Sequence, residues 1–181
     1  MKDINRIIND FWNDYVAKKK DSDLSGIIEG IPLVWHGNMD SYFSSKRRIV
    51  TVSLNPHYDA FKPNKKQFSE AGYKLISRLK TVDKLSDSDI NELVKLYNEY
   101  FVNYSYAAGD QIFKGYKSLF FDILNTSYFN ETGKNQVLHI DAATAIATNP
   151  VWRKISGRQK RKIKNIELTK QFIDFLKPNI I

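Results

Sequence analysis

RRIVTVSLNPHYDAF, residues 47–61, is the stretch that decides the fold. Its first half is an apolar run rich in β-branched residues, formed by Ile49, Val50, Val52 and Leu54. Such a run is typical of a buried central strand. Pro56 has no N–H group for a sheet ladder and forces Asn55 out of the helical region, so the strand has to end there. We therefore expect Asn55, His57 and Tyr58 at the carboxyl end of a strand, where open α/β sheets bind ligands.

A second apolar run at residues 137–141 predicts another central strand, in which His139 and Asp141 lie two residues apart and share one face. Residues 31–35 read as a short edge strand because they contain Pro32. Helical spacing of apolar residues recurs over residues 3–19, 68–80, about 89–101, 112–124 and 166–176. In the last of these helices the inward residues should be Ile166, Phe172, Ile173 and Leu176. This alternation predicts an α/β fold with a largely parallel sheet.

The length of 181 residues suits a single domain that spans residues 1–181, with its core starting at about residue 30. Residues 179–181 read as the beginning of a third strand. We expect that strand to be completed by residues beyond 181 or by a second chain.

The composition narrows the function. The chain has 28 basic and 20 acidic residues, a net charge of +8 and a pI near 9.5, which favours nucleic acid or another polyanion as a partner. It has no cysteine, which excludes disulfides, thiol nucleophiles and thiolate metal sites. The first turn is too polar for an export signal, and no apolar run approaches the roughly 20 residues that span a bilayer. We expect a cytoplasmic protein, bacterial or from a phage, that does not contact the membrane.

Two basic segments flank the expected site. One follows it directly and contains Lys62, Lys65 and Lys66; the other, residues 153–164, has seven basic residues among twelve. Both are interpreted either as solvated surface or as phosphate contacts. The residues that we expect to contact nucleic acid are Lys62, Lys65, Lys66, Arg153, Lys154, Arg158, Lys160 and Arg161.

The polar residues at the two strand ends suit hydrolysis of a glycosidic bond. An amide or carboxylate can hold the attacking water while the site stabilises the developing charge. His139 is the weakest member of this set, because a lone histidine in an apolar strand is more often a core residue. A metal site built from His57, Asp59, His139 and Asp141 has suitable ligand types but no close-spaced signature, so we expect no metal and no cofactor. The sequence contains no P-loop and no dinucleotide-binding glycine motif.

These motifs together resemble the uracil-DNA glycosylase superfamily, specifically its divergent members whose first motif is a strand running into Gly-Ile/Leu-Asn-Pro. Here that motif is Ser53-Leu54-Asn55-Pro56, and further similarity lies in residues 32–38 (PLVWHGN), 139–141 (HID) and 147–152 (ATNPVW). The resemblance covers most of residues 30–181. It implies a three-layer α/β/α fold with a mostly parallel central sheet.

The resemblance also implies an activity: such glycosylases flip a damaged or deaminated base out of DNA and hydrolyse its N-glycosidic bond without a metal. Asn55 would then position the water with His57 beside it, Tyr58 or Phe61 would stack on the base, and Asp141, with His139, would contact its edge. Asp141 stands where uracil-specific relatives often carry asparagine, which indicates a different base. The family's His-Pro-Ser-like motif would follow the third strand. The alternative is an inactive relative that binds nucleic acid or protein.

Overall fold

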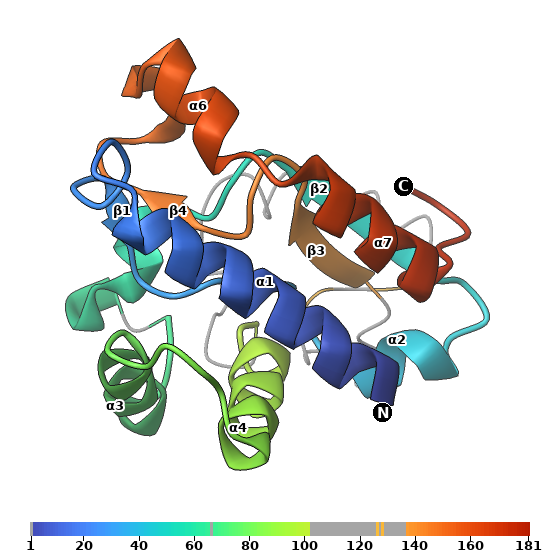
Figure 1. The fold of residues 1–181 in the computed structure, drawn as a ribbon. Helices are drawn as coiled ribbons and strands as arrows, with labels where there is room; N and C mark the ends of the chain where they lie inside the picture. The colour runs from blue at the N-terminus through green and yellow to red at the C-terminus, as the bar shows by residue number, and fades with distance from the viewer. Residues whose placement is uncertain (1, 66, 102–125, 127, 129–136) are drawn as a thin grey trace.

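The centre of the fold is a parallel pair of strands, β2 (Ile49–Ser53) and β3 (Val137–Asp141) (Figure 1). The computed structural model describes residues 2–65, 67–101, 126, 128 and 137–181. The two strands pair directly, from Ile49 beside Val137 to Ser53 beside Asp141. Because side chains alternate along a strand, this register creates two unlike faces. The core face carries Val50, Leu138 and Ile140, and the polar face carries Thr51, Ser53, His139 and Asp141.

Two helices cover the core face. Figure 1 shows α1 (Lys2–Lys20) and α7 (Ile166–Leu176) side by side in front of the β2–β3 pair. Phe11 of α1 meets Phe172 of α7 edge to face, with ring centroids 6.4 Å apart. Both helices were predicted from apolar periodicity and are confirmed. The prediction that Ile166 faces inward is wrong, because this first residue of α7 is 48% exposed.

Short backbone pairings widen this central pair on both sides. His36 and His139 exchange backbone hydrogen bonds of 2.8 and 3.0 Å as an antiparallel bridge, so residues 31–36 run beside β3 without forming a regular strand. On the other side Ile180 forms one parallel bridge with Ile49. A second pair, β1 (Ile28–Glu29) and β4 (Ala147–Thr148), is antiparallel. The fold is mixed α/β, but the described residues form two sheets of two strands each and do not show the expected three layers.

The remaining elements surround this centre. They are the α-helices α2 (Met39–Ser44), α3 (Glu70–Leu79), α4 (Asp87–Asn98) and α6 (Gly157–Ile163), and the short 3-10 helices η1 (Tyr58–Phe61), η2 (Pro63–Lys65) and η5 (Trp152–Lys154). α3 and α4 confirm two predicted helices, although α4 ends at Asn98 and not near Phe101. The helix predicted at 112–124 lies outside the described residues. None of the described helices has the length and hydrophobicity that a bilayer crossing would require.

A buried ammonium group joins α1 to α6. Lys18, only 8% exposed, donates to the Asp14 carboxylate at 2.6 Å and to the carbonyl oxygens of Ile163 and Lys164 at 2.6 and 3.4 Å. Burial lowers the pKa of Lys18, and the Asp14 carboxylate opposes that shift. The last turn of α1 therefore satisfies carbonyl groups at the end of α6, which lack partners within that helix.

The start of α4 generates a testable prediction. Asp89 accepts hydrogen bonds from the Ser86 side chain and backbone, and its carboxylate lies 2.6 Å from the Arg78 guanidinium. These contacts lower the pKa of Asp89, the Ser86 hydrogen bonds most and Arg78 less. Because the folded-state pKa is lower than the unfolded one, the ionised carboxylate stabilises the fold above about pH 4, and this contribution disappears as the pH falls through the folded-state pKa.

We expect Asp89→Asn to reduce the free energy of unfolding by about 1–2 kcal/mol at neutral pH, and progressively less below about pH 4. Urea denaturation across that pH range measures the difference. Asp87→Asn, an exposed carboxylate in the same helical turn, is the control and should change little. Equal losses in the two variants would contradict this account of the cap.

Candidate functional site

The residues after β2 line a small pocket with the residues after β4. Its walls, which we call the Asn55 pocket, are Asn55, Pro56, His57, Tyr58, Thr148, Val151 and Trp152. A parallel bridge between His57 and Thr148 holds the two walls together. The pocket has a volume of about 40 Å³. A water molecule needs roughly 10–15 Å³, so the pocket accommodates water but not a nucleobase.

The side chain of Asn55, one of the residues that line this pocket, keeps one hydrogen-bond acceptor unused. Its amide nitrogen donates to the Pro56 carbonyl oxygen at 3.2 Å and to Thr148 Oγ1 at 3.3 Å. Both amide hydrogens are thereby used, while no described residue donates to the amide oxygen. This arrangement leaves Oδ1 to accept a hydrogen bond from a water molecule.

An aromatic pair and a cation form the rim. The rings of His57 and Tyr58 stack with centroids 4.9 Å apart, and the Lys62 ammonium lies 4.4 Å from the centre of the Tyr58 ring. His57 Nδ1 accepts from the backbone N–H of Asp59 at 3.2 Å, which leaves its ring proton on Nε2. Lys62 pairs with Asp59 at 2.6 Å, and that hydrogen bond raises the pKa of Lys62.

The basic run divides into two parts. Arg153 and Lys154 lie in η5 beside the pocket residue Trp152, are exposed, and form no ion pair in the described part of the chain. Arg158 pairs with Asp23 at 2.6 Å, and Asp23 also pairs with Lys162. The charge of Arg158 is therefore partly neutralised within the protein. Three further predicted contacts, Lys65, Lys160 and Arg161, remain at the surface without a described ion pair, and Lys66 lies outside the described residues.

Phe61 belongs to the core and is not positioned to stack on a base. It is 8% exposed and packs near Phe68, with ring centroids 6.3 Å apart. Its ring also fills the space above Gly30, where an added Cβ would lie 2.3 Å from the ring, and the positive φ of +79° at Gly30 favours glycine for a second reason. Of the two aromatic residues expected to contact a base, only Tyr58 lines the pocket.

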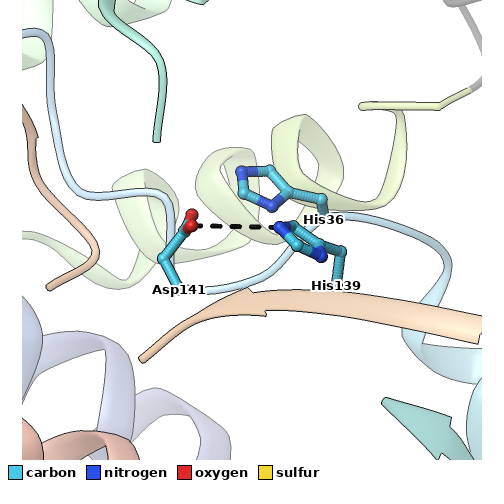
Figure 2. A group of neighbouring side chains, drawn as sticks. All are labelled: His36, His139 and Asp141. Carbon is cyan, nitrogen blue, oxygen red and sulfur yellow. Dashed lines mark ion pairs between the residues drawn. The ribbon is translucent and has the colours of Figure 1, made fainter. Parts of the chain in front are cut away.

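A second polar site lies on the polar face of β3. His36, His139 and Asp141, which we call the histidine cluster, are 2%, 5% and 4% exposed (Figure 2). The two imidazole rings stack with centroids 5.4 Å apart, and His139 Nε2 lies 3.8 Å from Asp141 Oδ1. Thr51 Oγ1 lies 2.9 Å from His139 Nδ1, and Ser53 donates to Asp141 Oδ1. The register of β2 and β3 places each of these hydroxyl groups beside its partner.

Burial dominates the electrostatics of the histidine cluster. Desolvation lowers the pKa of His139 to about 4 and that of His36 well below its ordinary value. The same effect raises the pKa of Asp141 to about 7, and the hydrogen bond from Ser53 opposes it. Both imidazoles are therefore neutral near pH 7, and the 3.8 Å contact of His139 with Asp141 is a polar contact and not an ion pair.

The structure separates residues that the sequence placed together. Asn55 lines its pocket with Thr148 and Trp152, whereas Asp141 and His139 lie in the buried cluster and do not line that pocket. The four residues considered from the sequence as a possible metal site are also separated, because His57 is exposed at the rim of the Asn55 pocket whereas His139 and Asp141 are buried. Sequence reasoning missed His36, Thr148 and Trp152. Their one available signal was that each belongs to a motif of the family resemblance, at 32–38 or 147–152.

Comparison of the chain with protein-family models found no matching family, and comparisons with curated proteins and solved structures found no significant match.

The reassignment of Phe61 predicts a contrast in stability. We expect Phe61→Ala to reduce the free energy of unfolding by about 3 kcal/mol, because it leaves a cavity next to Gly30. Tyr58→Ala, in the same short helix, should reduce it by less than about 1 kcal/mol, because the ring is only partly buried. Urea denaturation of the two variants measures both values. If Tyr58→Ala lost as much stability as Phe61→Ala, the assignment of Phe61 to the core and Tyr58 to the pocket would be wrong.

Proposed function

We propose that the protein is a DNA glycosylase-like enzyme that hydrolyses the N-glycosidic bond of a damaged or deaminated base. The observation that carries the proposal is the free amide oxygen of Asn55 in a water-sized pocket at the carboxyl end of β2. Such an oxygen holds a water molecule by one O–H group and directs its lone pair outward. Exposed basic residues beside the pocket suit a phosphate backbone.

In this proposal the bound water attacks C1′ of the sugar, and the bond between C1′ and the base nitrogen breaks. The electron pair of that bond leaves with the base, and one proton of the water passes to solvent. His57, which carries its ring proton on Nε2, donates a hydrogen bond to the departing base. The departing base anion takes up a proton from solvent, so the products are a free base and an abasic sugar.

The base has to leave the DNA stack to reach this water. The pocket is too small to enclose a base, so the base would lie at its mouth against Tyr58. Lys62, now over the Tyr58 ring, has a flexible and exposed side chain that a phosphate group can draw away. Because Asp141 does not line this pocket, we assign recognition of the base to the residues that do.

We further propose that the parallel β2–β3 pair and the Ile180 bridge belong to the central sheet of a three-layer α/β/α fold of the uracil-DNA glycosylase type. Three features support this: adjacent parallel strands, helices α1 and α7 over one face, and an Asn-Pro turn at the end of β2. Fold resemblance alone does not establish an activity.

One observation favours a second candidate function, a nucleic-acid-binding protein without catalytic activity. The Asn55 pocket holds water but not a base, and the carboxylate expected to contact the base is buried elsewhere. Both candidate functions use the same surface. An assay of strand cleavage therefore distinguishes them, whereas an assay of binding does not.

The cleavage assay uses a panel of duplex and single-stranded oligonucleotides, each with one modified base, in which alkali breaks the strand at any abasic site. We expect breakage at one class of base and a loss of at least about 100-fold in Asn55→Ala. Asn64→Ala, which removes an exposed amide with no described hydrogen bond, is the control. Binding without breakage at every base would favour the second candidate.

DNA binding itself generates a separate prediction. Removing Arg153 and Lys154 by a double alanine substitution should weaken binding and reduce the slope of log affinity against log salt by about 2, because two phosphate contacts are lost. The matched control removes two other exposed lysines, Lys74 and Lys170, whose partners are Glu70 and Glu167. Fluorescence anisotropy at several salt concentrations measures both slopes. Identical slopes would show that net charge alone, and not this surface, attracts DNA.

A further inference from the structure

The histidine cluster brings together three side chains of metal-ligand type from segments far apart in the sequence. His36 precedes α2, whereas His139 and Asp141 lie on one face of β3 (Figure 2). One potential ligand atom from each residue lies within 4.8 Å of the other two. All three side chains are more than nine-tenths buried. In the described part of the chain no other group of histidine and acidic residues meets this condition.

We propose that His36, His139 and Asp141 bind one divalent transition-metal ion. Both ring nitrogens of His36 and Oδ2 of Asp141 are buried without a hydrogen-bond partner among the described residues. A buried polar atom that lacks a partner destabilises the folded state unless something else binds it. One cation between the imidazole and the carboxylate would satisfy an atom of each residue at once.

The ligand types restrict the metal. Two imidazoles and one carboxylate suit Zn²⁺, Fe²⁺ or Co²⁺, whereas Ca²⁺ and Mg²⁺ prefer oxygen ligands alone. Three protein ligands also leave one tetrahedral position for water or a substrate atom. The chain has no cysteine, so no thiolate site competes for these ions.

The surroundings hold the ligands in place. The backbone bridge between His36 and His139 fixes the two ring-bearing residues opposite each other. Thr51 Oγ1 accepts from Tyr128 and lies 2.9 Å from His139 Nδ1, so it can orient that ring for binding through Nε2. Nε2 now lies 3.2 Å from Ser53 Oγ, a contact that a metal ion would replace. Ser53 orients the carboxylate of Asp141. Hydrogen bonds of this kind to the outer atoms of ligands are usual in metal sites.

Binding requires a small closure. Metal–nitrogen bonds of about 2.0–2.1 Å place the ligand atoms round one ion within roughly 4 Å of one another. The present separations are all within 4.8 Å, so the side chains have to approach by at most about an ångström. Side-chain rotation of His36 can provide this, because no described hydrogen bond holds its ring.

The test titrates the full chain, freed of metal with a chelator, with Zn²⁺ in a calorimeter and with Co²⁺ in a spectrophotometer, both without DNA. We expect one ion per chain, and a Co²⁺ absorption spectrum of nitrogen and oxygen ligands. His36→Asn, His139→Asn and Asp141→Asn should each weaken Zn²⁺ binding by at least about 100-fold. The chain contains three histidines, and the third, exposed His57, provides the matched control His57→Asn, which should bind as the wild type does.

Thermal unfolding distinguishes loss of the site from loss of the fold. Zn²⁺ should raise the melting temperature of the wild type and of His57→Asn, because it binds only the folded chain, and should leave the three ligand variants unchanged. Failure of the wild type to bind either ion would overturn the proposal, and so would binding that only His57→Asn abolishes. Neither result bears on strand cleavage at the Asn55 pocket, which is assayed with DNA.

Discussion

The rest of the structure depends on the parallel, in-register pairing of β2 with β3. This register places Thr51 beside His139 and Ser53 beside Asp141, so the polar residues of both strands share one face. The opposite face is apolar and packs beneath α1 and α7. A shift of one residue in either strand would move its polar side chains into that core, where they would lack partners. The pairing therefore determines both where the core forms and where buried polar chemistry is possible.

The same pairing sets the position of the surface pocket. The backbone N–H groups of Ala142 and Ala143 donate to the carbonyl oxygens of Ser53 and Leu54, which ties the ends of the two strands together. Beyond this point the segments that follow β2 and β3 diverge. The turn after β2 carries Asn55 outward to meet Thr148, while Asp141 stays buried on the polar face. The two sites thus lie on the same strand pair but have different environments: one faces solvent, and the other is buried.

Local patterns predicted the elements well, and contacts between distant segments decided what they missed. The runs at 49–54 and 137–141 predicted both central strands, because apolar β-branched residues favour buried strands. The expected burial of the first run is only partly right, since Val52 and Leu54 are 39% and 57% exposed. The position of Phe61 could not be predicted, because it depends on the space above Gly30. Likewise, nothing near Arg158 in the sequence reveals that Asp23 pairs with it. His36 entered a site only through its backbone bridge to His139, a contact across most of the chain.

The buried ammonium of Lys18 has a consequence for how the protein can be dissected. It binds the carbonyl oxygens that end α6 and so anchors the basic helix to the N-terminal helix, while the backbone N–H of Asn165 just after α6 donates to the Ala143 carbonyl oxygen beyond β3. A shortened chain that begins after residue 20 would keep β2, β3 and the ion pairs of Asp21 and Asp23 with α6, but the carbonyl groups at the end of α6 would lose their buried partner. The first twenty residues are thus a scaffold for a segment that the sequence places near the opposite end.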